Sequence, residues 1–129
     1  MTSSARIPRT IIRARRKPDP RRAVAHLAFI RQLPCLSCGA PGPSQAAHVR
    51  SSGDGGIGMK PGDRYTVSLC AACHHQQHQM GETAFFGALG IDALNTSLRL
   101  WTVSGDIDAG KRCIERARAW MRLAQMEER

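Results

Sequence analysis

The apolar residues of this chain recur at helical intervals near the N-terminus and again over the C-terminal part. Residues 21–33 carry an apolar side chain at roughly every third position, which predicts a helix that Pro34 ends. Similar spacing predicts three more helices, at about 82–89, about 92–103 and about 107–127. The apolar stripe expected along the last helix comprises Ile107, Cys113 or Ile114, Ala117, Trp120, Met121 and Ala124.

Two short strands and a glycine-rich segment lie between these helical regions. Residues 65–69 (YTVSL) are rich in β-branched side chains and alternate in polarity, which predicts a strand, and residues 45–50 (QAAHVR) predict a second one. The intervening residues 51–63 contain five glycines, and we expect a mobile loop without regular structure there. A short helix is expected from about Cys73 to Met80.

The chain is long enough for one small domain with tails, because it has 129 residues of which 42% are hydrophobic. Its formal charge is +9, and residues 1–22 alone hold eight Lys or Arg and one Asp, a net +7 (8 − 1). We expect a disordered basic arm that binds a polyanion such as a nucleic acid, or one that serves only as a solubilising extension. No apolar run reaches the length of a bilayer span, and none follows the basic N-terminus, so we expect neither a membrane partner nor a signal peptide.

Four of the five cysteines form two C-x-x-C pairs, Cys35–Cys38 and Cys70–Cys73. Without a secretory signal, this pairing favours a metal site over disulfides, and a redox dithiol would need only one pair. Two such pairs suit one tetrahedral zinc ion bound by four thiolates. We therefore predict a structural Zn²⁺ site, with Cys113 as a small buried apolar residue and not a ligand.

Four of the five histidines lie between positions 48 and 78, and three of them follow the second cysteine pair in the order C-x-x-C-H-H-x-x-H. On a helix, His74 and His78 share a face and can bind one divalent ion, whereas His75 points elsewhere. The alternative is that these histidines replace cysteines at the zinc or are ordinary surface residues. Because four cysteines already complete a zinc site, the surplus favours a second metal site.

The motifs follow one another as Cys35-x2-Cys38, His48, the glycine-rich loop, the strand YTVSL, and Cys70-x2-Cys73-His74-x3-His78. Over about residues 33–80, this order resembles the zinc-containing HNH endonucleases, which have the ββα-metal fold. The run from Ala46 to Glu82 looks like HNH-type proteins encoded by phages and prophages, some of which are associated with recombination. The resemblance implies an α+β fold, in which a small zinc-stapled ββα-metal (HNH-like) centre is surrounded by helices.

Position by position, the resemblance gives His48 the role of the general base that activates water, and makes His74 and His78 ligands of a catalytic cation. That cation is Mg²⁺ or Mn²⁺, with Zn²⁺ or Ni²⁺ as alternatives. Two positions depart from the family pattern: Ala47 stands where a metal-binding acid or histidine is usual, and the middle position, near Asp63, is not Asn. Asp63 either holds His48 and the loop in place or supplies the missing carboxylate ligand.

Residues of the loop and the arm complete the expected site. Lys60 is expected to act in catalysis with His48 and Asp63, and Asp54 is a second candidate for the missing carboxylate. The nucleic-acid-binding residues that we expect are Arg50 and Arg64 beside the site, and Arg13, Arg15, Arg16 and Lys17 in the arm. Arg64 has the alternative of being an ordinary solvated charge.

These expectations divide the chain into a basic flexible arm (1–22), an HNH-like nuclease core (23–81) and a helical C-terminal extension that packs on the core (82–129). The predicted activity is metal-dependent hydrolysis of DNA phosphodiester bonds, with RNA as the alternative polymer. The resemblance implies a phage or prophage protein that acts in the cytoplasm of a bacterial host. A recombination protein is a candidate partner, and cleavage could require it. The competing hypothesis is a zinc-stapled nucleic-acid-binding adaptor whose active site has decayed, which Ala47 favours. The sequence carries no indication of the oligomeric state.

Overall fold

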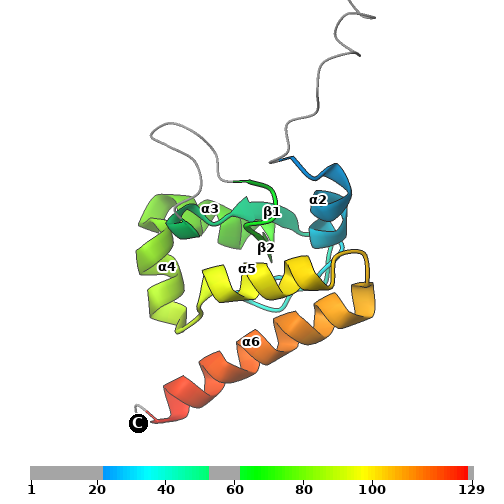
Figure 1. Cartoon of the computed structure of the whole chain (residues 1–129). Coiled ribbons are helices and arrows are strands. Elements are labelled where there is room, and N and C mark those ends of the chain that lie inside the picture. The colour runs from blue at the N-terminus through cyan, green and yellow to red at the C-terminus, as the bar shows by residue number, and fades with distance from the viewer. Residues whose placement is uncertain (1–21, 53–61, 128–129) are drawn as a thin grey trace, which may run out of the picture.

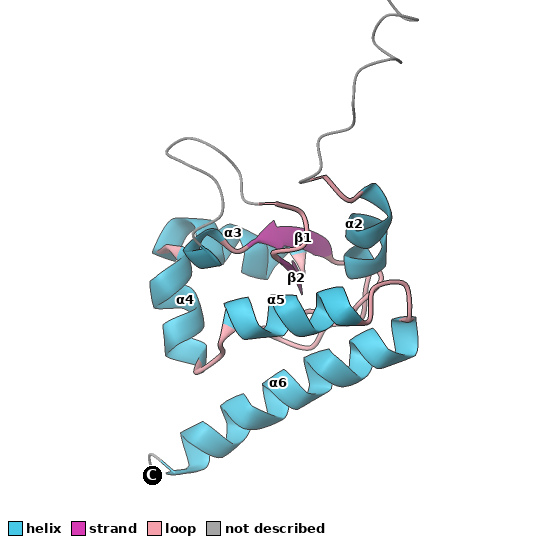
Figure 2. Ribbon diagram, viewed as in Figure 1, coloured by secondary structure: helices cyan, strands magenta, loops and turns pink. Residues whose placement is uncertain are grey.

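The computed structural model describes residues 22–52 and 62–127, and it has the α+β architecture that the sequence predicts. A two-stranded antiparallel sheet lies among helices (Figure 1, Figure 2). In chain order the elements are α2 (Val24–Arg31), β1 (Gln45–His48), the short 3-10 helix η2 (Arg50–Ser52), β2 (Thr66–Leu69), α3 (Ala71–Met80), α4 (Glu82–Leu89), α5 (Ala93–Thr102) and α6 (Ile107–Glu127). The expected disordered arm, except for Arg22, and most of the glycine-rich loop lie outside the described residues.

The sheet brings together the two segments that carry most of the candidate site. β1 and β2 run antiparallel, with His48 opposite Thr66. All four residues of β2 are buried, because α2 and α5 both contact this strand. Its two polar side chains are satisfied: Thr66 donates to the carbonyl of Asp63 at 2.8 Å, and Ser68 donates to that of Pro34 at 2.7 Å. The alternating pattern of β2 therefore does not mark an exposed face, since both faces are covered.

The described part of the chain has a hydrophobic core to which helices from both ends contribute. α2 supplies Phe29 and Ile30, α5 supplies Leu100 and α6 supplies Ile114, and each is at most 2% exposed. Gly110 lets α6 approach α2 closely, because a Cβ at this position would lie 2.7 Å from the Phe29 ring. The C-terminal helices therefore pack into the same core as the sheet.

The apolar stripe expected along α6 is wrong at Trp120. Ile114 and Met121 are buried as expected, but Trp120 is 71% exposed. α5 and α6 diverge from their connecting turn, so the C-terminal part of α6 extends away from the rest of the molecule (Figure 1). Helical periodicity identifies the apolar face of α6, but it does not show where the neighbouring helix ends.

The helix ends follow local chemistry that can be recognised in the sequence. Asp92 caps α5 by accepting a hydrogen bond from the backbone N–H of Asn95 at 2.9 Å. Gly90 ends α4 in the left-handed region, with a φ of 72°. The first helix is shorter than the expected 21–33, and β1 ends before the expected residue 50. No described helix combines the length and the apolar character that a membrane span requires.

The expectation that residues 51–63 lack regular structure is wrong at their start, where the chain forms η2. The backbone N–H groups of Arg50 and Ser51 both donate to the carboxylate of Glu82, at 2.7 and 2.9 Å. A carboxylate that accepts two N–H groups at the start of a helical turn stabilises that turn. Glu82 lies 31 residues beyond Ser51, so the composition of the loop gives no sign of this contact.

Candidate metal centre and active site

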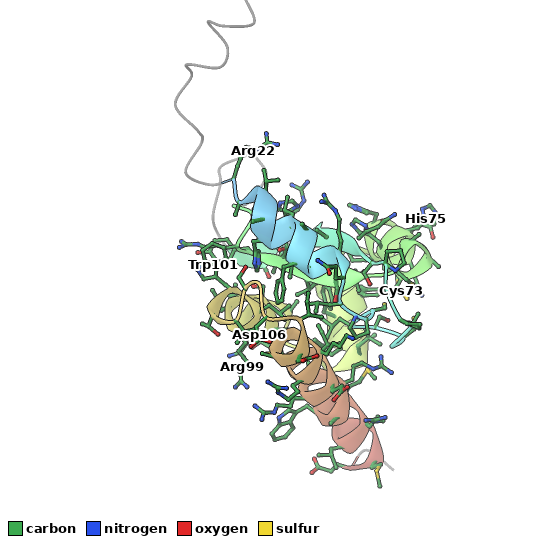
Figure 3. The ribbon with its side chains drawn as sticks, turned by 90° about the vertical axis from the view of Figure 1, so that its right-hand side faces the viewer. Arg22, Cys73, His75, Arg99, Trp101 and Asp106 are labelled. Atoms are coloured by element: carbon green, nitrogen blue, oxygen red, sulfur yellow. The ribbon has the colours of Figure 1, made fainter. Side chains whose placement is uncertain are left out.

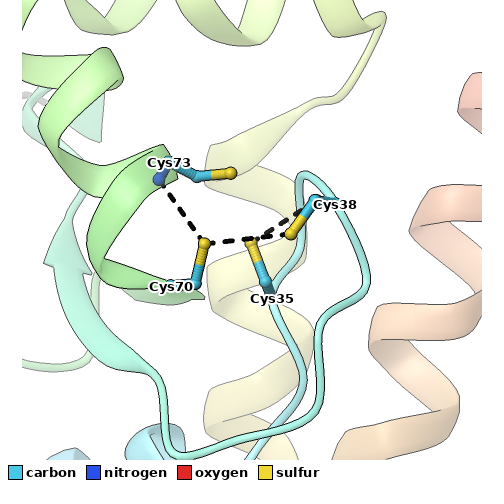
Figure 4. Close-up of side chains that lie close together, drawn as sticks. All are labelled: Cys35, Cys38, Cys70 and Cys73. Carbon is cyan, nitrogen blue, oxygen red and sulfur yellow. Dashed lines mark hydrogen bonds between the residues drawn. The ribbon is translucent and has the colours of Figure 1, made fainter.

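Four cysteine side chains from the two C-x-x-C pairs converge on one point (Figure 4). The Sγ atoms of Cys35, Cys38, Cys70 and Cys73 all lie within 4.8 Å of one another, and those of Cys38 and Cys70 are 3.8 Å apart. Zinc binds thiolates at about 2.3 Å, so tetrahedral geometry requires sulfur atoms about 3.8 Å apart. The predicted cysteine cluster is therefore confirmed, and its geometry and ligand chemistry fit a structural Zn²⁺.

Each cysteine pair forms a tight turn whose backbone points at a sulfur atom. In the first turn, the N–H of Cys38 donates to Cys35 Sγ at 3.4 Å. In the second, Cys70 directly follows β2 and caps α3, where its Sγ accepts from the N–H of Cys73 at 3.5 Å. Such N–H groups stabilise a thiolate, which is the form that binds metal. The sequence predicts this repetition, since both turns have the same C-x-x-C spacing.

The four thiols differ in their tendency to ionise. The pKa of Cys70 is lowered to about 7, mainly because its sulfur accepts a hydrogen bond from the backbone N–H of Cys73. Burial acts in the opposite direction but is outweighed. Burial is the main cause that raises the pKa of Cys73 to about 12. Cys73 therefore stays a neutral thiol at neutral pH without a cation, and a divalent metal would supply the charge that stabilises its thiolate.

Helix α6 also supports the first cysteine turn. The Arg118 guanidinium donates to the carbonyls of Leu36 and Ser37, at 3.3 and 2.5 Å. It lies against Gly39, where a Cβ would come within 2.9 Å of the guanidinium. Cys113 is in the same helix and is not a member of the cysteine cluster, but it is only partly buried where a buried residue was expected. Sequence analysis missed Arg118, because its partners are backbone atoms more than 80 residues away.

His48 and Asp63 form a contact across the glycine-rich segment. His48 lies at the end of β1, and its Nε2 is 3.0 Å from Asp63 Oδ1. The other carboxylate oxygen of Asp63 accepts the backbone N–H of Ala23 at 2.8 Å. Of the two roles expected for Asp63, this geometry matches the one in which it holds His48 in place.

Asp63 is a buried carboxylate that remains ionised. Burial acts to raise its pKa, but the hydrogen bonds from His48 and from the N–H of Ala23 outweigh that effect, so the pKa of Asp63 lies below its ordinary value. A negative charge therefore lies next to His48 at neutral pH. That charge favours the tautomer in which His48 carries its proton on Nε2 and leaves Nδ1 as the basic nitrogen.

His74 and His78 form a pair on the exposed side of α3. Their Nε2 atoms are 3.1 Å apart, as the one-turn spacing predicts, and His74 Nδ1 is 2.8 Å from Gln45 Oε1. Two imidazoles bound to one cation at about 2.1 Å, with an angle of 90–110°, would place their nitrogens about 3.0–3.4 Å apart. The pair is thus spaced for two adjacent ligands of one divalent cation, and β1 contributes the hydrogen bond that orients His74.

His74 is suited to metal binding near neutral pH. Partial burial is the main cause that lowers its pKa, and the nearby His78 and His48 lower it further. A neutral imidazole is the metal-binding form. His75 is exposed at the outer edge of the molecule (Figure 3).

The three histidines of the expected active site do not form one tight ligand group. Among the described residues, the four cysteines form the one group of three or more possible metal ligands whose ligand atoms all lie within 4.8 Å of one another. The three histidines do not form such a group. His48 pairs with Asp63, whereas His74 pairs with Gln45 and His78. Ala47, where the family pattern has a ligand, is 2% exposed and belongs to the core.

The basic residues expected beside the site are only partly described. Arg50 and Arg64 are exposed, and the Arg64 guanidinium lies over the Tyr65 ring, 4.8 Å from its centroid. The other expected charged residues of the loop and the arm lie outside the described residues: Asp54, Lys60, Arg13, Arg15, Arg16 and Lys17.

Sequence analysis also missed the environment of His26. This side chain is 2% exposed, its Nδ1 is 2.7 Å from Ser104 Oγ, and its ring meets that of Trp101 edge-on. Its Nε2 is buried without a hydrogen-bond partner in the described part of the chain. Burial is the main cause that lowers the pKa of His26, although the Asp63 charge acts in the opposite direction. His26 therefore stays neutral inside the fold and links α2 to the α5–α6 turn.

Comparison with known proteins places these features within a family. The family described as "Protein of unknown function (DUF968)" matches residues 8–93, which is 86 of the 129 residues. No curated protein and no solved structure gives a significant match. The matched segment contains both cysteine pairs, the His48–Asp63 contact and the His74–His78 pair, and it ends where α5 begins. The chain belongs to the DUF968 family.

Proposed function

We propose that this protein is a metal-dependent endonuclease that hydrolyses DNA phosphodiester bonds. The observation that carries the proposal is the His48–Asp63 contact at the end of β1, a strand that contacts α3, where a pair of histidines is spaced for one cation. A base held by a carboxylate and a neighbouring cation site are two components that phosphodiester hydrolysis requires. The resemblance to HNH endonucleases supports the same assignment.

His48 would act as the general base. With Asp63 accepting from Nε2, the unprotonated Nδ1 is available to take a proton from water. The His48 side chain is 22% exposed, so solvent and substrate can reach it, while the Asp63 side chain is only 11% exposed. Asp63 would thus position the base without contacting the substrate itself.

His74 and His78 would hold the catalytic cation, and Gln45 would orient His74. A divalent cation bound there would stabilise the charge that develops on the phosphoryl oxygens and the leaving oxygen. Imidazole nitrogens without a carboxylate ligand suit Zn²⁺ or Ni²⁺ better than Mg²⁺. Of the expected cations, we therefore favour Zn²⁺ or Ni²⁺, with Mn²⁺ next.

DNA is the proposed substrate because of the charge distribution of the chain. Residues 1–22 carry a net +7, and the exposed Arg50 and Arg64 lie on either side of the glycine-rich segment. Contacts of this kind bind phosphates without selecting a base sequence. Cleavage is therefore proposed to be non-specific or directed by nucleic-acid structure. RNA is the alternative substrate, and phage recombination is the proposed biological process.

A second candidate function is a nucleic-acid-binding adaptor whose active site has decayed. It is favoured by Ala47, whose buried methyl group offers no ligand, and by the absence of a three-histidine ligand group among the described residues. Both functions include binding of nucleic acid and a structural zinc ion. They differ in whether the bound strand is cut.

Plasmid nicking separates these two functions. The full chain is incubated with supercoiled DNA and Mg²⁺, Mn²⁺, Ni²⁺ or Zn²⁺, and the His48→Ala and His75→Ala variants are compared with it. We expect His48→Ala to lose about 10²- to 10⁴-fold in rate, as removal of a general base does, while it retains DNA binding. His75→Ala is the matched control, because this exposed histidine lies on α3 outside the pair. Binding without cleavage by the wild type under every cation would favour the adaptor.

A further inference from the structure

A pocket of about 310 Å³ lies between α5 and α6, away from the residues of the proposed active site. It lies toward the N-terminal end of α5, since Gly90, Ile91 and Asp92 also line it. Its walls include Asn95, Thr96 and Arg99 of α5, and Arg116, Ala117 and Trp120 of α6. Seven of the ten lining residues lie beyond residue 93, where the segment that matches the family ends. The volume is that of a small-ligand site.

The pocket brings an exposed aromatic ring next to two cationic side chains. Trp120 is 71% exposed, and Arg99 and Arg116 are both exposed. Arg99 Nε donates to Asn95 Oδ1 at 2.8 Å, which holds this guanidinium against α5. Asp92 also lines the pocket, but its carboxylate caps α5, and the lining keeps a net charge of +1 (2 − 1).

Trp120 is the aromatic side chain of this chain that is most available for stacking. All six aromatic residues are described, and the three phenylalanines are buried in the core. The Tyr65 ring is covered by Arg64. Trp101 is 40% exposed and meets His26 edge-on. An exposed indole beside guanidinium groups is the combination that single-stranded nucleic acids bind, with the base on the ring and the phosphate on the cations.

We propose that the α5–α6 pocket binds one unpaired nucleotide of a single-stranded nucleic acid, with its base stacked on Trp120 and its phosphate beside Arg99 and Arg116. A purely apolar partner would leave both cations unused, whereas a duplex keeps its bases stacked and cannot place one in the pocket. This inference shares with the proposed function the assumption of a nucleic-acid partner, but it does not require cleavage. It assigns a preference for unpaired strands to a part of the chain outside the HNH-like region.

Tryptophan fluorescence of the full chain tests the proposal directly. In a Trp101→Phe variant, Trp120 is the one remaining tryptophan, so any quenching by a short thymidine oligonucleotide reports on the pocket. The titration contains no divalent cation, which keeps binding separate from cleavage. We expect saturable quenching, and Arg116→Gln should weaken the affinity about tenfold, which corresponds to about 1.4 kcal/mol. Arg122→Gln, which removes the same charge from an exposed position of α6 outside the pocket, should leave the affinity nearly unchanged.

A second variant keeps the test independent of the Trp101 substitution. Trp120→Ala, made in the native chain, should weaken oligonucleotide binding measured by fluorescence anisotropy by about fivefold or more, the minimum for loss of one stacked base. It should leave duplex binding unchanged. Saturation with oligonucleotide without any change in Trp120 fluorescence would overturn the proposal, as would equal effects of Arg116→Gln and Arg122→Gln. Self-association of the wild type that Trp120→Ala abolishes, with oligonucleotide binding unaffected, would assign the pocket to a second copy of the chain instead. If the quenching fails while plasmid nicking persists, only this inference fails.

Discussion

Replacing Asp63 by asparagine changes one atom of the His48–Asp63 contact and should reverse its hydrogen bonding. In the wild type, the two carboxylate oxygens accept from His48 Nε2 and from the backbone N–H of Ala23. The N–H of Ala23 can only donate, so the oxygen of the introduced amide must remain opposite it. The new NH₂ group then faces His48 Nε2, which must become an acceptor. The proton of His48 is expected to move to Nδ1, so the nitrogen that would accept a proton from water is blocked.

The structure gives the size of this effect. The substitution removes one charge-assisted hydrogen bond, which contributes about 1.5–3 kcal/mol when it is buried. Because the His48 side chain keeps 22% of its surface exposed, we expect the low end, a loss of about 1.5 kcal/mol in the free energy of unfolding. Nicking activity should fall about 10²-fold or more, as for loss of a general base. DNA binding should not change, because neither side chain is assigned to phosphate contact.

Nitrogen-15 NMR of the histidine side chains measures the tautomer of His48, and urea unfolding measures the stability. Asp92→Asn is the matched control, because Asp92 accepts one backbone N–H at the start of α5 and Asn caps helices equally well. The control should keep the Nε2–H tautomer of His48 and lose little stability. The reasoning is refuted if Asp63→Asn keeps the His48 proton on Nε2, or if the tautomer changes while nicking does not.

The same variant should change the acid sensitivity of the fold. The pKa of Asp63 is lowered in the folded protein, so the stabilisation from its charge is present above the ordinary carboxyl value of about 3.9. It is lost as the pH falls through the folded value, since the unfolded chain takes up the proton first. The difference in unfolding free energy between wild type and Asp63→Asn should therefore shrink below about pH 4. A constant difference down to about pH 2 would contradict this account.

Three further predictions concern the fold. Gly110→Ala should lower the free energy of unfolding, measured in urea, by about 1–2 kcal/mol, because its Cβ would lie 2.7 Å from the Phe29 ring. Gly87→Ala should raise it by about 0.5–1 kcal/mol, because a Cβ there would have nothing within 4 Å. Equal effects would contradict the close approach of α2 and α6. A strong chelator should unfold the chain, as judged by circular dichroism, because zinc binding supplies folding energy to the four-cysteine centre; an unchanged spectrum after metal removal would contradict a structural role. Because burial lowers the pKa of His26, the wild type should lose stability as the pH falls below about 6.5, and His26→Phe should lose less over this range; parallel pH profiles would contradict a buried neutral His26.

Local patterns in the sequence predicted the elements and the cysteines of the four-cysteine cluster well. The C-x-x-C spacing and the one-turn separation of His74 and His78 fix geometry within a few residues, so the structure bears out both groupings. The C-terminal helices also lie where their apolar periodicity places them. The histidine pair and the helices depend on interactions within a few turns of the chain, whereas the cysteine cluster also needs two C-x-x-C turns about 32 residues apart to meet.

Contacts between distant segments could not be predicted in the same way. Asp63 was a candidate for two roles, and only the folded chain brings its carboxylate to His48 and to the N–H of Ala23. Glu82 and Arg118 form hydrogen bonds with backbone atoms. Every residue type has these atoms, so the sequence of the partner segment does not indicate the contact. The exposure of Trp120 depends on the angle between α5 and α6, and hydrophobic periodicity does not predict that angle.

The central claim is that the histidine pair binds a second metal ion, separate from the ion of the cysteine centre. Anomalous diffraction from crystals grown with Zn²⁺ and with Ni²⁺, recorded at each absorption edge, locates the two ions independently. The account predicts Zn²⁺ among the four cysteines in both crystals and a second cation bound by His74 and His78. A single ion in both crystals, or imidazole nitrogens bound to the zinc of the cysteine centre, would contradict it.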